Sequence, residues 1–345
     1  MALLEVDDVR VSFNTDDGVV HAVRGVSFEV ERGKTLGIVG ESGSGKSVCT
    51  QTITGLTRGA NIEGTAMFDG MDLLQASEQQ LRAIRGRKIG MIFQDPLTSL
   101  HPAYSVGWQI IEMIRAHDRK TSKAKAKERA VELLGLVGIP YAKDRVDDYP
   151  HQFSGGMRQR VMIAMAVALN PALLIADEPT TALDVTVQAQ VLRVMRKVQE
   201  EFGTAIILIT HDLGVVAEMA DEIAVMYAGR IVEQGRADTI FNAPEHPYTE
   251  GLLNSLPKHE GPIMRLTPIV GTPPSLIHPP RGCPFAPRCP YVFNRCVEET
   301  PPLEPVFGTT THTSACFLSS YEEERKQNRE ELHARQATAQ NEGAA

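Results

Sequence analysis

Residues 40–47 read GESGSGKS, a glycine-rich stretch whose residue types suit it to holding a polyphosphate. They fit the pattern G-x-x-x-x-G-K-S/T, in which glycines let the backbone turn tightly so that successive N–H groups point at one anion. Lys46 is placed to reach the β- and γ-phosphates, and the Ser47 hydroxyl to bind Mg²⁺. The stretch predicts these nucleotide contacts: Gly40, Ser42, Gly43, Ser44, Gly45, Lys46, Ser47 and Val48.

The flanking residues supply the elements that such a loop needs. Residues 34–39 are mostly apolar and predict a buried strand, and residues 48–53 can open a helix. A helix N-terminus adds partial positive charge to an anion site. A strand, a glycine turn and a helix start in this order favour a phosphate site over a glycine-rich loop without a ligand.

Two acids follow a second apolar run. Residues 173–176 predict a buried strand, and Asp177 and Glu178 come directly after them. Asp177 is expected to bind Mg²⁺, and Glu178 to polarise the attacking water. The preceding apolar strand favours this interpretation over a solvated acidic turn.

Two further polar residues follow strands in the same way. Gln94 follows a predicted strand over 88–93 and can ligate Mg²⁺ or position a water. His211 follows a buried strand over 205–209 and can contact the γ-phosphate. Each would be a weak signal alone, and the interpretation depends on the phosphate loop earlier in the chain.

Residues 153–160 read FSGGMRQR and precede an apolar helix over 161–169. Ser154 suits a helix N-cap, and Gly155 and Gly156 leave backbone N–H groups uncovered. The stretch therefore predicts a second anion-binding helix N-terminus.

Strand and helix signals alternate along the chain and predict an α/β fold. Residues 3–11 and 26–31 predict an antiparallel hairpin, and residues 95–153 carry helical patterns, a helical insertion in the α/β core. Phe13, in the hairpin, could stack on a purine ring, or it could be an ordinary core aromatic.

Cys283, Cys289, Cys296 and Cys316 cluster in a proline-rich segment. In a reducing compartment such a cluster argues for a metal rather than for disulfides. Four thiolates can hold an iron–sulfur cluster or a structural Zn²⁺. The wide spacings favour the iron–sulfur cluster, because zinc sites favour closely spaced pairs; reduced free thiols are the third alternative.

Composition narrows the class of protein. The 345 residues carry a formal net charge of −8, which argues against a nucleic-acid partner because such proteins usually show a basic face. No signal-peptide pattern opens the chain, and Asn170-Pro171 interrupts the longest apolar run, so we expect any membrane role to come through a partner. Residues 321–345 are highly charged and predict an exposed helix or a disordered tail.

In this combination and order, the motifs resemble the ATP-binding cassette (ABC) ATPases over residues 1–260. That family's signature usually reads LSGGQ; this chain departs from it at Phe153 and Met157 but keeps the serine and both glycines. The resemblance implies a RecA-like parallel-sheet core, an antiparallel β subdomain and a helical subdomain at about 95–165. It also adds Asp184 to the nucleotide site.

Three stretches narrow the resemblance to one branch. The wording FSGGMRQR, the run HPYT at 246–249 followed by two leucines, and the cysteine region 283–316 are similar to the D-type ATPase subunits of bacterial dipeptide/oligopeptide or nickel importers. Some members of that branch carry a 4Fe–4S cluster at these cysteines. The domain prediction is then an ATPase domain over 1–260, a cysteine-containing extension over 261–320 and the tail over 321–345.

The resemblance also implies partners and a place in the cell. We expect ATP and Mg²⁺ to be bound between this chain and a second ATPase subunit, in a heterodimer at the cytoplasmic face of the membrane. Two transmembrane permease subunits would dock on it near residues 95–105, and an extracytoplasmic solute-binding protein would act indirectly. Peptides, nickel and other small solutes all fit as cargo. A soluble ABC ATPase acting on DNA or ribosomes and an exporter ATPase are the alternatives.

Overall fold

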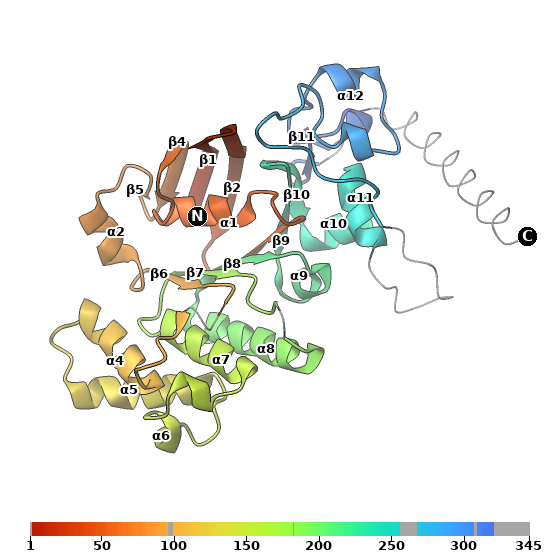
Figure 1. Cartoon of the computed structure of the whole chain (residues 1–345). Helices are drawn as coiled ribbons and strands as arrows, with labels where there is room; N and C mark the ends of the chain where they lie inside the picture. The colour runs from red at the N-terminus through yellow and green to blue at the C-terminus, as the bar shows by residue number, and fades with distance from the viewer. Residues whose placement is uncertain (1, 96–98, 182, 256–267, 307–308, 321–345) are drawn as a thin grey trace, which may run out of the picture.

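The computed structural model describes residues 2–95, 99–181, 183–255, 268–306 and 309–320 (Figure 1). Its strands are β1 (Ala2–Thr15), β2 (Gly18–Glu31), β3 (Thr35–Val39), β4 (Ala60–Phe68), β5 (Met71–Asp72), β6 (Ile89–Ile92), β7 (Leu173–Asp177), β8 (Ala205–Thr210), β9 (Glu222–Tyr227), β10 (Arg230–Arg236), β11 (Glu304–Pro305) and β12 (Thr313–Ser314). Its α-helices are α1 (Lys46–Ile53), α2 (Glu78–Ile84), α4 (Val106–His117), α5 (Lys123–Leu136), α6 (Ala142–Arg145), α7 (Gly155–Ala166), α8 (Val185–Phe202), α9 (Leu213–Met219), α10 (Ala237–Asn242), α11 (Pro247–Asn254) and α12 (Asn294–Glu298).

The antiparallel sheet has the order β2-β1-β4-β5. Buried and exposed residues alternate along β1 as a half-buried strand requires, with Val6 buried and Glu5 exposed. The predicted hairpin is confirmed, but its strands are longer than expected because the turn needs only the residues between Thr15 and Gly18. Asp8, at φ 43°, lies where the register shifts between Val6 and Val9, which lets the long strand bend.

The central sheet has the order β11-β12-β10-β9-β3-β8-β7-β6, and its strands from β9 to β6 are parallel. Every residue of β3, β7 and β8 is buried, which explains why these strands read as continuous apolar runs. The carboxyl ends of parallel strands meet at one edge of a sheet, where ligands of open α/β folds bind. The phosphate loop, Asp177 and His211 therefore come to the same edge.

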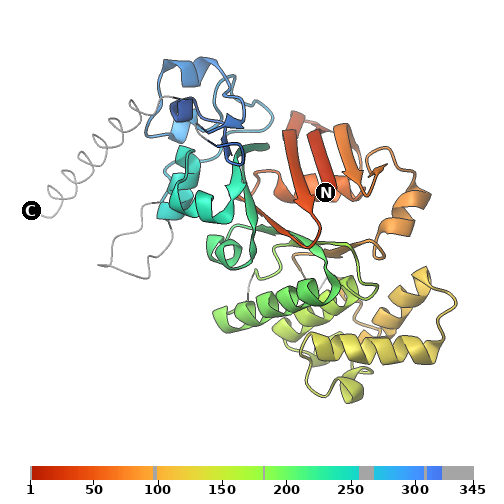
Figure 2. The same ribbon diagram turned by 180° about the vertical axis from the view of Figure 1, so that it is seen from behind.

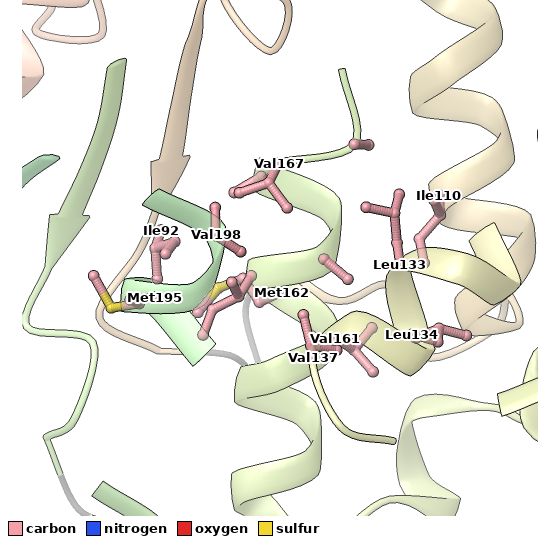
Figure 3. Packing of buried hydrophobic residues seen from close by; sticks show 14 of the residues in the cluster. Ile92, Ile110, Leu133, Leu134, Val137, Val161, Met162, Val167, Met195 and Val198 are labelled. Atoms are coloured by element: carbon pink, nitrogen blue, oxygen red, sulfur yellow. The ribbon is translucent and has the colours of Figure 1, made fainter. Parts of the chain in front are cut away.

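Alternate residues of the parallel strands enter two different cores. Ile207 and Ile209 of β8 pack with Cys49 and Ile53 of α1 and with the antiparallel sheet. Leu208 of the same strand packs with α7 and α8, in the core that Figure 3 shows from close by. Consequently α1 and α7 lie on opposite faces of the sheet (Figure 1).

The predicted helical insertion is confirmed as the segment that carries α4 to α7. Ser105, Ser122 and Ser154 begin α4, α5 and α7, and each hydroxyl accepts a hydrogen bond from a backbone N–H of the first turn. The buried faces of these helices meet in one cluster, in which Ile110, Leu133 and Val161 are fully buried (Figure 3).

The chain after β10 extends the central sheet. β12 pairs with β10 at the sheet edge, and β11 pairs with β12. Tyr248 of α11 and Phe285 pack against Tyr227 of β9, so this part shares its core with the sheet. The sequence predicted a loop-rich extension and missed these strands. The predicted tail, 321–345, lies outside the described residues; within the described ones, no helix combines the length and apolarity needed to span a membrane.

Candidate functional site

Steric limits explain the glycines of the phosphate loop. A side chain at Gly40 would overlap the backbone carbonyl oxygen of Met226, and one at Gly45 would overlap that of Ala22. All three glycines have a positive φ, but the space beside the Cα of Gly43 is open. The loop is thus packed tightly against β2 and β9 at two glycines, while the third leaves room for an anion.

Lys46 is buried beside the loop, with a relative exposure of 5%. Its Nζ donates hydrogen bonds to the carbonyl oxygens of Gly40, at 2.7 Å, and Glu41, at 2.9 Å. Burial lowers the pKa of Lys46, and the negative charges of Glu178, Asp177 and Glu41 partly offset this effect. A phosphate anion would supply a further negative partner for the ammonium group.

Ser47 and Asp177 are brought together, as a shared Mg²⁺ site requires. The Ser47 Oγ donates a hydrogen bond of 2.8 Å to Asp177 Oδ1. Burial raises the pKa of Asp177 above its usual value, although the Ser47 hydrogen bond and the charge of Lys46 oppose the shift. Hydroxyl and carboxylate oxygens are ligands that Mg²⁺ prefers. Gln94, the third predicted ligand, instead contacts Glu178.

Glu178 is surrounded by polar partners. Its carboxylate accepts hydrogen bonds of 2.9 Å from Gln94 Nε2 and from Thr181 Oγ1, and its Oε1 lies 3.2 Å from His211 Nδ1. Partial burial raises the pKa of Glu178, but the Thr181 and His211 hydrogen bonds and the charge of Lys46 outweigh it, so the net pKa is lowered. The three predicted catalytic residues therefore meet. Sequence reasoning missed Thr181, whose position follows from the turn after β7.

The glycines at the start of α7 have different surroundings. A side chain on Gly156 would overlap Val187 of α8, whereas Gly155 has open space beside its Cα. Ser154 Oγ accepts a hydrogen bond of 3.4 Å from Met157 N, which confirms the prediction that Ser154 is the N-cap of this helix. Asp184 also caps a helix, accepting 2.9 Å from Val187 N. Residues 154–156 thus lie at the start of α7, the helix on the opposite face of the central sheet from α1.

Phe13 lies in β1, opposite Val20 of β2 and Ala60 of β4. It is partly buried and packs against the core between the antiparallel sheet and β3. This placement suits the core interpretation, and stacking on a purine stays a prediction.

The four clustered cysteines line one small cavity of about 10 Å³ beside Phe285 and Phe317. Burial raises the pKa of Cys289 and Cys316 to about 12, so their thiols are neutral in this state. The donor chemistry suits a soft metal, but the cavity has about the volume of one water molecule. Within the part of the chain that the structure describes, no set of three or more His, Cys, Asp or Glu side chains converges on a metal position. The predicted 4Fe–4S cluster and its Zn²⁺ alternative are therefore not supported.

Sequence reasoning also missed the partners of Glu41. In the loop pattern Glu41 occupies a position at which any residue is allowed. In the structure Arg288 pairs with the Glu41 carboxylate, and the Tyr248 hydroxyl accepts a hydrogen bond from the Glu41 N–H. These partners lie more than 200 residues away, and no local pattern points to them.

Known families match this chain in two places. Residues 23–181 match the family described as ABC transporter. Residues 232–296 match the family described as oligopeptide/dipeptide transporter, C-terminal region. The first match covers the phosphate loop and the strand tip at Asp177, and the second covers α10, α11 and three of the clustered cysteines.

Curated relatives extend the similarity over most of the chain. The oligopeptide transport ATP-binding protein OppD of Bacillus subtilis (strain 168) is 56% identical over 89% of this chain and 87% of its own length. The dipeptide transport ATP-binding protein DppD of Lactococcus lactis subsp. cremoris (strain MG1363) is 52% identical over 92% of this chain and 90% of its own.

Solved structures share the fold. A dimeric bacterial ABC transporter cassette matches with a TM-score of 0.62 and 28% identity, covering 68% of this chain and 98% of that chain. A dimeric cassette in a post-hydrolysis state, bound to ADP and Pi, matches with the same TM-score and 27% identity over the same shares. The matched fold is thus an ABC nucleotide-binding domain.

Proposed function

Because the chain belongs to the ATP-binding subunits of the oligopeptide/dipeptide ABC transporters, we propose that it hydrolyses ATP to drive peptide import. The similarity to OppD over 89% of the chain carries the proposal, and the site geometry agrees with it. The relatives' names favour peptides over the nickel alternative.

The phosphate loop binds the triphosphate in this proposal. Its backbone N–H groups and the N-terminus of α1 face the phosphates, and Lys46 exchanges its carbonyl partners for phosphate oxygens. Ser47 and Asp177 would hold Mg²⁺, which neutralises charge developing on the phosphates.

Glu178 activates the attacking water. Its lowered pKa keeps the carboxylate ionised at neutral pH, so it can accept a hydrogen bond from water. His211, next to Glu178 and 59% exposed, is free to turn toward a γ-phosphate. Gln94 connects Glu178 to the segment that leads into α4, and can thus report the state of the site to the helical subdomain.

Two chains are needed to complete a nucleotide pocket in this proposal. The opposite placement of α1 and α7 supports it, because Ser154, Gly155 and Gly156 lie on the other face of the sheet from the phosphate loop. ATP would be held between the phosphate loop of one ATPase and the signature residues of the other, with Asp184 at the contact. Hydrolysis then removes the bridging γ-phosphate and shifts the population toward the open dimer.

Docking on two permease subunits places the chain at the cytoplasmic face of the membrane. The predicted docking segment, 95–105, is described except for 96–98. Tyr104 of this segment stacks on Trp108 of α4, with ring centroids 4.0 Å apart, and both side chains are exposed, which offers aromatic surface to a partner. The second ATPase is a different chain in this proposal, and the solute-binding protein acts only through the permeases.

Replacing Glu178 with Gln in the assembled transporter tests the catalytic assignment. Nucleotide binding should persist while ATP turnover falls at least about 100-fold, the range expected when a positioned acid–base group is lost. Glu201→Gln, at an exposed position of α8, is the matched control, and the transporter that carries it should hydrolyse ATP at the normal rate. A full ATPase rate in the Glu178 variant would show that the assignment is wrong.

A separate part of the proposal concerns the clustered cysteines: a 4Fe–4S cluster held by Cys283, Cys289, Cys296 and Cys316, with Zn²⁺ as the alternative. Its basis is that all four thiols line one cavity, and cluster binding would require the segment to open beyond the present volume of that cavity. Iron, sulfide and zinc analysis of anaerobically purified chain separates the cases. Iron and sulfide in equal amounts support the cluster, stoichiometric zinc supports the alternative, and absence of all three leaves structural thiols.

A further inference from the structure

Arg288 joins the cysteine-rich segment, which holds the clustered cysteines between residues 283 and 316, to the phosphate loop at residues 40–47. Its side chain is only 5% exposed, and its Nη1 and Nη2 donate hydrogen bonds of 2.7 and 2.9 Å to the two carboxylate oxygens of Glu41. This two-bond geometry between a guanidinium and a carboxylate fixes orientation as well as distance. Glu41 is the second residue of the loop, directly after Gly40.

The remaining surroundings hold Arg288 in one position. Its Nε donates to the Val270 carbonyl oxygen at 3.1 Å, and its other donors reach Tyr227 Oη at 3.2 Å and the Ile269 carbonyl oxygen at 3.3 Å. The guanidinium also lies over the ring of Phe285, 6.0 Å from its centroid. The hydrogen bond to Glu41 raises the pKa of Arg288 further above its usual value, so the guanidinium stays charged.

The backbone of Glu41 organises the phosphate loop. Its N–H donates a 2.8 Å hydrogen bond to Tyr248 Oη, and its carbonyl oxygen accepts from Lys46 Nζ and from Ser44 N. One residue of the loop is therefore held by Arg288 through its side chain and by Tyr248 through its backbone. Both holders come from the chain beyond β10, outside the part that forms the loop.

We propose that Arg288 is a positioning residue for nucleotide binding, which acts by holding Glu41 and thereby the phosphate loop in its anion-binding conformation. The proposal rests on the proposed function, because it assumes that this loop binds ATP. A loop that is competent for only a fraction of the time shows a correspondingly weaker apparent affinity. Arg288 raises affinity for both ADP and ATP, and it leaves the hydrolytic step unchanged because Glu178 and Asp177 do not contact it.

Binding of a fluorescent ADP analogue to the purified full-length chain tests this assignment. Arg288→Gln should weaken nucleotide affinity about tenfold, the amount expected when a loop becomes competent about one tenth of the time. Glu41→Gln, which keeps a hydrogen-bonding side chain, is the second variant and should give a similar loss. Combining both should weaken affinity no further, because the two changes remove the same contact.

Matched variants separate positioning from simple folding defects. Arg295→Gln removes an arginine of the same segment that pairs with Glu299 and lies over Phe317, and it should leave affinity unchanged. Arg288→Lys should restore part of the affinity, since lysine keeps the charge but not the two-bond fork. In the assembled transporter, Arg288→Gln should raise KM for ATP about tenfold while kcat stays within about twofold.

The contrary results are distinct. If Arg288→Gln lowers the melting temperature but the folded chain binds the analogue as tightly as the unaltered chain, the arginine only anchors the segment and the proposal is wrong. Additive losses in the double variant would also overturn it. If the unaltered chain and a Lys46→Ala variant bind nucleotide equally poorly, the proposed function fails instead.

Discussion

Asp177 and Glu178 are adjacent in sequence, yet their carboxylates have different partners. Asp177 ends β7 and faces Ser47, whereas Glu178 has a left-handed backbone at φ 48° and faces Gln94, Thr181 and His211. Such a conformation in a residue other than glycine costs about 1–3 kcal/mol and persists where the surroundings fix it. The strained turn therefore separates the carboxylate proposed to bind Mg²⁺ from the carboxylate proposed to activate water, although the two residues are adjacent.

The two glycines of the signature offer a test at the residue scale. Gly156→Ala forces a methyl group into Val187 and should lower the free energy of unfolding by about 1–3 kcal/mol. The methyl group added by Gly155→Ala would lie in open space within the described part of the chain, so the free energy of unfolding should stay nearly unchanged. Chemical denaturation of the isolated chain measures both values.

The same pair distinguishes packing from phosphate contact. If Gly155 faces a nucleotide on the partner ATPase, Gly155→Ala should reduce ATP turnover of the assembled transporter although the chain itself is as stable as before. A variant with normal turnover would remove Gly155 from the proposed contacts.

At the scale of elements, α11 begins with an unusual cap. His246 is buried, and its Nδ1 accepts a 3.0 Å hydrogen bond from Tyr248 N. Burial lowers the pKa of His246 to about 4, and the charge of Glu233 opposes this shift only in part. The cap requires a neutral imidazole, because a protonated ring has no acceptor to offer.

This cap predicts a pH dependence of stability. Between pH 6.5 and about pH 4 the unfolded chain binds a proton at His246 that the folded chain does not, so the free energy of unfolding falls as the pH falls through this window. The shift corresponds to about 3 kcal/mol, at 1.36 kcal/mol for each pH unit. Denaturation curves measured from pH 7 to pH 4 would reveal the slope.

His246→Asn is the matched variant for this dependence. Asparagine is a good N-cap and does not titrate, so the slope between pH 6.5 and pH 4 should become shallower while the helix keeps an acceptor. An unchanged slope would assign the dependence to other groups.

At the scale of the whole molecule, the central sheet separates the two proposed half-sites. The phosphate loop and α1 lie on one side of it and α7 on the other, as the alternation of β8 residues between two cores requires (Figure 2). The chain beyond β10 extends one edge of this sheet with β12 and β11 and reaches the phosphate loop through Arg288. The phosphate loop and the cysteine-rich segment are thereby parts of one structural unit.

Separate half-sites make a prediction about the assembled transporter. Lys46→Ala should disable one nucleotide pocket and Ser154→Arg the other, so each variant should trap about half the nucleotide that the unaltered complex traps with vanadate. The double variant, with both changes on this one chain, should trap none. Half-normal trapping by the double variant would mean that both residues serve the same pocket, and the shared-pocket arrangement would be wrong.

Local patterns in the sequence determined much of this protein. The phosphate loop, the buried strands with polar residues at their ends and the serine cap of α7 each depend on a few consecutive residues, so type and spacing were sufficient. Tertiary packing alone decided which side chains meet across the chain. Arg288 and Glu41 are 247 residues apart, and Thr181 reaches Glu178 only because of the turn after β7. The cysteines show the same limit, since sequence gave the donor types, whereas packing set the small cavity that does not support the predicted metal.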